Sequence, residues 1–329
     1  MFTPPIGIAA WLTGLHFYLC RKWLHLVVRI FQEQPLFVIP RGEPVAGAED
    51  VRFRNTDGLT LCGCYLRTSL AERRGVILFG LEFGSNRWSC LSYCDKLLQD
   101  GYDIFAFETR GQGESDMHPG YEPLQWVTDF EVRDTEAALA YMKTRPDADP
   151  RGVGFFGISK GAGAGLFAAA RDPYVRCCVT DGVFATYTTL VPYMRLWFRI
   201  YDNQYRLQGL IPSWYYGVIG LKALRRIEKE RGCHFPHLER SLRRLSPRPV
   251  LMIHGGGDTY IKPHMARTLA DKAREPKELW MVEGAKHNQA LLLAGDDYQR
   301  RVTDFFNRHL AVPVREAGVP REQEVAAHP

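Results

Sequence analysis

An alternation of strand and helix patterns over residues 51–310 is the feature that most constrains how this chain can fold. It opens with VRFRNTDGLTLCGCYLR, where Asp57-Gly58 separates two alternating stretches, a pattern typical of a β-hairpin. Short apolar runs and helical stretches then follow one another. Strands that alternate with helices predict an α/β fold, in which helices cover both faces of a mostly parallel sheet.

The apolar runs after the hairpin have the length of buried strands. They lie at residues 75–79, 102–107, 152–156, 175–180, 249–254 and 278–282. Helical patterns lie at residues 87–99, 124–144, 157–171, 263–274 and 298–310. We therefore predict one α/β domain over residues 51–310.

One connection interrupts the alternation. About seventy residues separate Thr180 from the strand that starts at Pro249, and so long a connection in a compact domain usually has structure of its own. Its central part, residues 185–247, is rich in Tyr, Trp and Arg. We predict a helical cap over one end of the sheet, with a peripheral helical addition as the alternative.

Three further segments lie outside this domain. Residues 1–33 combine an apolar run with an amphipathic stretch and predict a helical segment. Residues 34–50 contain several Pro and Gly without a period, which is typical of a linker. Residues 311–329 are polar and aperiodic, and we predict a disordered tail.

The N-terminal segment has two interpretations. Its apolar run, residues 6–20, is shorter than the roughly twenty residues that span a bilayer, and no signal-peptide pattern precedes it. In the following helix Arg21, Lys22, His25 and Arg29 share one face, which is typical of an anchor at a membrane surface. The alternative is a helix that packs on the domain. Either way we predict a cytoplasmic protein, membrane-associated in the first case.

Composition excludes some classes of function. The net charge of +5 is small for 329 residues and no long basic tract is present, so nucleic acid is not an expected partner. The eight cysteines show no zinc-site spacing, and we interpret them as buried thiols. Neither an H-E-x-x-H zinc motif nor an early G-x-G-x-x-G dinucleotide motif occurs, so we expect no metal and no cofactor.

A nucleophilic serine is predicted at Ser159. Gly157-Ile158-Ser159-Lys160-Gly161 matches G-x-S-x-G and lies between the buried strand GVGFF and a Gly/Ala-rich helix. That context matters, because a tight strand-to-helix turn holds the serine in a strained and accessible conformation. The alternative is a serine that only caps the helix.

The acid and the base of a catalytic triad are predicted at Asp258 and His287. Each lies in a loop directly after a strand, and the order Ser, Asp, His is typical of chains with a G-x-S-x-G serine at a strand-to-helix turn. Such loops meet at the carboxyl ends of parallel strands. His254 and His264 flank the acid loop and are predicted to have local structural roles. The remaining histidines are assigned to other segments.

On these motifs the chain resembles the α/β-hydrolase superfamily over residues 51–310, especially its dienelactone-hydrolase-like, Bem46-like and serine-aminopeptidase-like branches. Residues 107–116, FETRGQGESD, are similar to a turn after strand 4 in these proteins. The elbow Gly-Ile-Ser-Lys-Gly-Ala also resembles that of acyl-CoA thioesterases. The resemblance implies an α/β-hydrolase fold and a serine hydrolase.

The resemblance also implies an oxyanion hole of main-chain N–H groups, at Lys160 and at Phe83 or Glu82. Leu81-Glu82 stands where these hydrolases commonly carry His-Gly. We expect the Glu82 side chain to form a structural ion pair with Arg87 or Arg110. The Lys160 ammonium either adds positive potential for an acidic substrate such as a CoA thioester or, as we expect, points away.

These features predict a hydrolase of carboxylic esters or thioesters with an apolar acyl part, acting through an acyl-enzyme. The expected partner is a small-molecule ester or thioester. Peptidase, amidase or acyltransferase chemistry would use the same triad. A noncatalytic binding protein is the alternative from another class.

Overall fold

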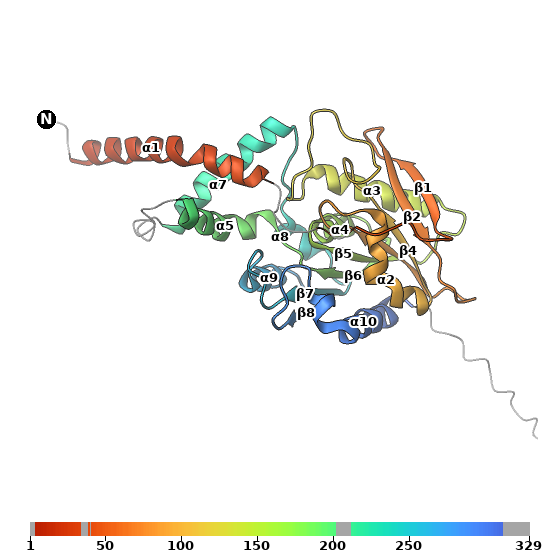
Figure 1. The fold of residues 1–329 in the computed structure, drawn as a ribbon. Helices are drawn as coiled ribbons and strands as arrows, with labels where there is room; N and C mark the ends of the chain where they lie inside the picture. Colours follow the sequence, from red (N-terminus) through yellow and green to blue (C-terminus); the bar gives the residue numbers. More distant parts are fainter. Residues whose placement is uncertain (1–3, 34–38, 40, 202–211, 312–329) are drawn as a thin grey trace, which may run out of the picture.

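A computed structural model describes residues 4–33, 39, 41–201 and 212–311 (Figure 1). At its centre is an eight-stranded sheet in the order β1-β2-β4-β3-β5-β6-β7-β8. Strand β2 is antiparallel to both of its neighbours, and all other pairs are parallel. The strands are β1 (Glu49–Arg54), β2 (Thr60–Leu66), β3 (Gly75–Gly80), β4 (Tyr102–Phe107), β5 (Val153–Ile158), β6 (Val175–Asp181), β7 (Val250–Gly255) and β8 (Lys277–Val282).

Helices cover both faces of this sheet, each over its own apolar cluster. Helices α3 (Asp129–Thr144), α4 (Ser159–Arg171) and α9 (Pro263–Ala270) pack on one face. Helices α2 (Cys90–Gln99) and α10 (Ala290–His309) pack on the other. Strands β3, β4, β5 and β7 are buried along their whole length, as expected of strands covered on both sides. The predicted α/β architecture is confirmed.

The insert between β6 and β7 forms a helical cap, as predicted. It consists of α5 (Thr186–Tyr201), α7 (Ser213–Arg231), α8 (Leu238–Ser241) and the 3₁₀ turn η2 (Leu242–Arg244). The N-terminal helix α1 (Pro4–Gln32) lies along the cap, and its first half extends away from the rest of the molecule (Figure 1). None of the helices in the described part of the chain combines the length and apolar character needed to cross a bilayer.

Two predicted helix boundaries are wrong, for local reasons. The helix predicted from residue 124 begins at Asp129, because the Thr128 hydroxyl accepts a bond from Phe130 N–H and Glu131 accepts one from Thr128 N–H. The helix predicted from residue 298 begins at Ala290. Gly295, with φ +48° and ψ −119°, interrupts its geometry and therefore its hydrophobic period.

All eight cysteines are free thiols, and every one except Cys20 is buried. Burial raises the pKa of Cys177 and Cys178, the latter to about 12, so both are held as thiols. The linker predicted at residues 34–50 is described only in part. The predicted tail lies outside the described residues, apart from Ala311.

Candidate active site

Ser159 lies at the sharp turn between β5 and α4. It is the first residue of α4, and its φ of +50° falls in the left-handed region that is costly for a residue with a Cβ. The residue is largely buried. The strain persists because the strand and the helix on either side of the turn are both packed in the core.

The two glycines of the motif allow this turn to form. A Cβ on Gly161 would lie 2.3 Å from the Leu81 carbonyl oxygen, and a Cβ on Gly157 would lie 2.7 Å from Ala162 Cα. Since both obstacles are main-chain atoms, no side chain could move aside to make room. Small residues therefore let α4 approach the end of β3, and this approach places the loop after β3 beside Ser159.

His287 and Asp258 lie in line with the serine. His287 Nε2 is 3.0 Å from Ser159 Oγ, and His287 Nδ1 is 2.7 Å from Asp258 Oδ2. The carboxylate can only accept, so Nδ1 carries the proton and Nε2 is free to accept the proton of the serine hydroxyl. The structure thus brings together the three residues that the sequence predicts as a triad.

Further contacts hold Asp258 and the imidazole in place. The other carboxylate oxygen, Oδ1, accepts the N–H groups of Tyr260 and Ile261 at 2.8 and 2.9 Å. The Tyr260 ring packs edge-on against His287, with ring centroids 5.4 Å apart. Tyr260 also donates a hydrogen bond to Gln125. This bond connects the loop that contains Asp258 to the segment before α3. Sequence reasoning did not single out Tyr260, although it lies only two residues after Asp258.

Lys160 presents its main chain, not its ammonium, to the serine. Its Nζ is 2.9 Å from Glu131 Oε1 in a buried ion pair. Burial alone would raise the pKa of Glu131, but the ammonium and hydrogen bonds from Thr128 and Tyr121 hold it below its usual value. Meanwhile Lys160 N–H belongs to the first turn of α4, where N–H groups lack partners within the helix. This group is suitably placed to bind an oxyanion.

Glu82 does not form the ion pair expected from the sequence. Arg87 pairs with Glu108, Glu114 and Asp50, and Arg110 pairs with Asp134 and Asp57. Glu82 instead accepts a 2.7 Å bond from Asn288 Nδ2, and burial raises the pKa of its carboxyl group. The expectation failed because both arginines are already neutralised by nearer carboxylates.

The Glu82–Asn288 bond connects the loop after β3 to the residue after His287. Asn288 has a φ of +55°, so the backbone beside His287 is also strained. The main-chain oxygen of Glu82 accepts a 2.8 Å bond from Gln112. Hydrogen bonds therefore hold both the side chain and the main chain of Glu82. They order the segment that contains the predicted donors Glu82 N–H and Phe83 N–H.

A second buried acid, Asp181, lies at the end of β6. Its Oδ2 accepts a 3.0 Å bond from Tyr298 Oη, and its Oδ1 has no hydrogen-bond partner among the described residues. Burial raises the pKa of Asp181 to about 7. Sequence reasoning missed this residue, although Asp181-Gly182 follows a buried strand just as the triad loops do.

The other histidines near the acid loop do not contact Ser159. His254 Nε2 is 2.7 Å from the Ile261 carbonyl oxygen, and burial lowers the pKa of its imidazole, so it is a neutral donor that fixes the acid loop. His264 lies exposed in the first turn of α9. His237 stacks on Tyr187 within the cap.

A cavity of about 320 Å³ lies beside the elbow. Phe83 and Lys160 contribute to its wall, together with Ile39 from the segment before β1 and with Gln112 and Pro123. Its position next to the predicted oxyanion donors makes it the candidate space for part of a substrate.

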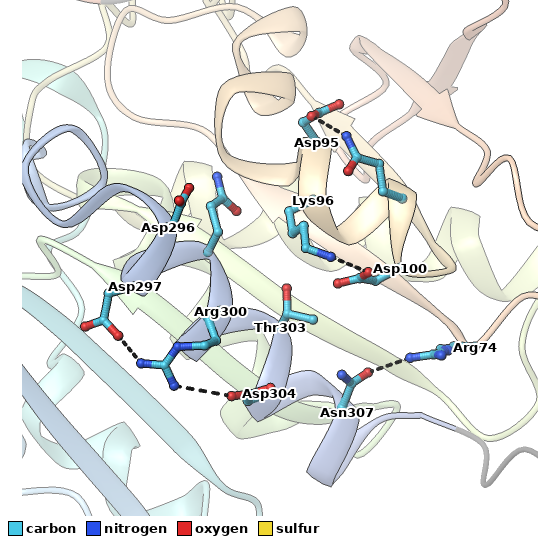
Figure 2. A pocket seen from close by; sticks show the side chains of 12 residues that line it. Arg74, Asp95, Lys96, Asp100, Asp296, Asp297, Arg300, Thr303, Asp304 and Asn307 are labelled. Atoms are coloured by element: carbon cyan, nitrogen blue, oxygen red, sulfur yellow. Dashed lines mark hydrogen bonds and ion pairs between the residues drawn. The ribbon is translucent and has the colours of Figure 1, made fainter.

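A hollow of about 740 Å³ between α2 and α10 is different in character (Figure 2). Neither Lys160 nor Phe83 lines it, unlike the first cavity, and several of its charged side chains bond to their neighbours. Lys96 bonds Asp100, Arg300 bonds Asp297, and Arg74 bonds Asn307 at 3.2 Å. Because no residue of the strand-to-helix turn at Ser159 lines the hollow, we assign it no part in the chemistry. No cluster of three potential metal ligands occurs in the described ranges.

Comparison with known proteins gives consistent results. YfhR of Escherichia coli K12, an uncharacterized protein, is 26% identical over 78% of this chain and 80% of its own length. The polyketide transferase ATR5 of Stachybotrys chlorohalonatus is 26% identical over 80% of this chain and 97% of its own.

Among solved structures, the α/β hydrolase GrgF from Penicillium superposes with a TM-score of 0.61 at 21% identity, over 80% of this chain and 99% of its own. The Pyrococcus furiosus esterase Pf2001 superposes with a TM-score of 0.60 at 18% identity, over 83% of this chain and 99% of its own. At these identities the likeness concerns the fold. Residues 80–304, more than half of the chain, match the alpha/beta hydrolase family. The chain therefore belongs to the alpha/beta hydrolase family.

Proposed function

We propose that this protein is a serine hydrolase that cleaves a carboxylic ester or thioester with an apolar acyl part. The observation that carries the proposal is the line from Ser159 Oγ through His287 to Asp258, with spacings of 3.0 and 2.7 Å, at a strained elbow. Nucleophile, base and orienting acid in such a line are the requirement for acyl transfer through a serine.

The proposed reaction has two halves. In the first, Ser159 Oγ attacks the acyl carbon as its proton passes to His287 Nε2, and the imidazolium then protonates the departing alcohol or thiol. Asp258 stabilises the imidazolium and keeps Nδ1 protonated. In the second half, water loses a proton to His287 and attacks the acyl-enzyme, and the carboxylic acid leaves as Ser159 regains its proton.

The negative oxygen of each tetrahedral intermediate needs main-chain donors. We assign them to Lys160 N–H and to Phe83 or Glu82 N–H, because the Gly161 contact brings the loop after β3 against the elbow. Since the Lys160 ammonium is neutralised by Glu131, we do not assign it to binding a phosphate-bearing substrate. This favours an uncharged ester over a CoA thioester.

The apolar acyl part is inferred from aromatic side chains of the cap and of the loops next to it. Trp126, Tyr193 and Tyr260 form a connected aromatic cluster that ends at His287. Since aromatic side chains next to a few polar groups are typical of sites that bind apolar groups, this cluster next to His287 supports an apolar acyl part.

The experiment that tests the proposal is hydrolysis of p-nitrophenyl esters from acetate to palmitate by the wild type and by Ser159→Ala. We expect the variant to lose at least about three orders of magnitude in kcat. Labelling by a fluorophosphonate probe should disappear in the same variant. An active Ser159→Ala protein would refute the serine mechanism, and absence of both labelling and turnover in the wild type would favour the noncatalytic alternative.

Acyl transfer to an acceptor other than water is a second candidate, favoured by the similarity to a polyketide transferase. It uses the same acyl-enzyme, so the two are distinguished by product. Adding alcohols or amines during turnover should yield only the carboxylic acid if water is the acceptor. A product ester or amide that dominates over the acid would favour the transferase.

A further inference from the structure

Helix α1 changes its surroundings halfway along its length. From His16 onward, one stripe of the helix contacts the cap. His16 Nδ1 is 3.0 Å from Tyr215 Oη, and Trp23, Val27 and Phe31 are buried against the cap. The twelve residues before His16 extend past this contact, a length of about 18 Å at the rise of an α-helix.

Large apolar side chains are exposed on this projecting half and just after it. Trp11 is 66% exposed and Leu12 and Leu15 are also exposed, while Phe17 and Tyr18, directly after His16, are 69% and 59% exposed. Trp214, at the start of α7, is 68% exposed, and its ring packs edge-on against Tyr215, the residue that contacts His16. A helix that is apolar on all sides is normally covered, so this clustering indicates a missing partner.

The charges next to these side chains indicate what the partner is. At about 100° per residue, Trp11 and Tyr18 share the face of α1 that carries Lys22, His25 and Arg29, opposite the stripe on the cap. All five side chains on this outer face are exposed. Aromatic side chains followed along one face by basic ones match the layers of an anionic bilayer, with its acyl boundary next to its headgroups.

We propose that the projecting half of α1, together with Trp214, docks onto the surface of an anionic lipid bilayer. The helix is tilted, so that its first half reaches the acyl boundary without crossing the bilayer, in keeping with the absence of a bilayer-spanning helix in the described part of the chain. Its basic second half faces the headgroups, and the cap is held next to the membrane. The proposal concerns binding and does not depend on the proposed reaction.

The test is flotation of the full chain with vesicles of phosphatidylcholine, alone or mixed with phosphatidylserine, at low and high salt. We expect binding to the mixed vesicles that weakens as salt is raised, because part of it is electrostatic. No binding by the wild type to either composition would overturn the proposal.

Two double variants locate the surface. Trp11→Glu with Phe17→Glu should lower the partition coefficient at least about tenfold, because two apolar groups that enter the bilayer become charged. The matched control, Leu292→Glu with Leu293→Glu, alters exposed leucines on α10, across the molecule from α1 (Figure 1), and should bind like the wild type. Equal binding by all three proteins would overturn the proposal.

A charge variant and a mass measurement complete the design. Arg21→Gln with Lys22→Gln should weaken binding several-fold on the anionic vesicles only. Light scattering without lipid tests whether a second copy of the chain covers the helix instead. A wild-type dimer that the Trp11/Phe17 variant converts to a monomer would overturn the proposal. Unchanged circular dichroism and unchanged hydrolysis of a soluble ester would show that the variants are folded.

Discussion

At the carboxyl ends of β5, β7 and β8, the side chains of the proposed triad are held by hydrogen bonds. The cap and the second half of α1 are held mainly by aromatic packing. Asp258 alone accepts bonds from His287, Tyr260 and Ile261. In the cap region, Phe31 stacks on Trp126 with ring centroids 4.9 Å apart, and Trp126 lies edge-on to Tyr193 at 5.3 Å.

The difference follows from what each region has to do. Hydrogen bonds are directional, so they fix the reacting atoms within tenths of an ångström, which proton transfer requires. Aromatic and apolar contacts tolerate small displacements and can repack around ligands of different size. We therefore expect changes in the sheet region to alter the rate, and changes in the cap to alter the preference for substrate.

The largest expected effect comes from removing the charge of the orienting acid. Asp258→Asn should lower kcat for a short ester by about 10⁴, because the amide can donate to Nδ1 and thereby favours the wrong imidazole tautomer. Steady-state kinetics with p-nitrophenyl acetate measure this loss. Asp271→Asn, an exposed acid after α9, is the control. A loss below tenfold would mean that another acid, such as Asp181, orients the histidine.

Asp181→Asn should make stability less dependent on pH. The folded pKa of Asp181, about 7, lies above the ordinary value of 3.8, so the unfolded chain releases this proton first. The free energy of unfolding of the wild type therefore falls between about pH 4 and pH 7 and then levels off. Asp181 contributes at most about 4 kcal/mol to this fall. Asparagine stays neutral and can still accept from Tyr298.

The measurement for Asp181→Asn is urea unfolding from pH 4 to pH 8. The free energy of unfolding of the variant should exceed that of the wild type most at pH 8 and only slightly at pH 4. A gain that is equal at both ends of this range would contradict the assignment of a raised pKa.

Phe31→Ala tests the aromatic contact between α1 and the cap. Loss of this fully buried ring should cost about 3 kcal/mol in the free energy of unfolding. Because the ring packs on Trp126 and Tyr193, turnover of long-chain esters should change more than turnover of acetate. Leu12→Ala, on the exposed half of α1, should leave both unchanged. Equal effects on acetate and palmitate would argue against separate roles for the two regions.

The smallest effect compares two glycines of α4. Gly161→Ala should destabilise by about 1–3 kcal/mol and reduce kcat, because the new Cβ meets the main chain of Leu81. At Gly163 the nearest obstacle is a side-chain methyl group of Val127 at 2.9 Å instead of main-chain atoms at 2.3 Å, and alanine favours the helix. Gly163→Ala should therefore cost less stability than Gly161→Ala and leave kcat unchanged. Thermal unfolding and p-nitrophenyl acetate kinetics of the two variants test whether the close contact between Gly161 and Leu81 is needed for stability and turnover.

The parts of the site that the sequence predicts well are those defined by local pattern. A strand followed at once by Ser159, or by a loop with Asp258 or His287, is visible in a short window, and parallel strands bring such loops to one edge. The partners of Glu82 and Lys160 were harder to foresee. Asn288 lies 206 residues from Glu82, and no local pattern signals that contact.

The N-terminal segment shows a second limit. The sequence divides residues 6–31 into an apolar run and an amphipathic helix, whereas the structure has one continuous helix over Pro4–Gln32. Its contacts with α7 depend on side chains of the distant insert, such as Tyr215. The sequence of that insert shows little hydrophobic period. Only the three-dimensional arrangement shows which half of α1 is covered.

The packing of α1 also has a consequence for how the chain is made. Trp126, whose indole donates to the Phe31 carbonyl oxygen, is separated from it by 95 residues, and Tyr215 is separated from His16 by 199. During synthesis from the N-terminus, α1 leaves the ribosome long before either partner exists. For that period its Trp, Phe and Leu side chains are uncovered on both halves, and they stay accessible to other apolar surfaces until the segments around Trp126 and Tyr215 have been made.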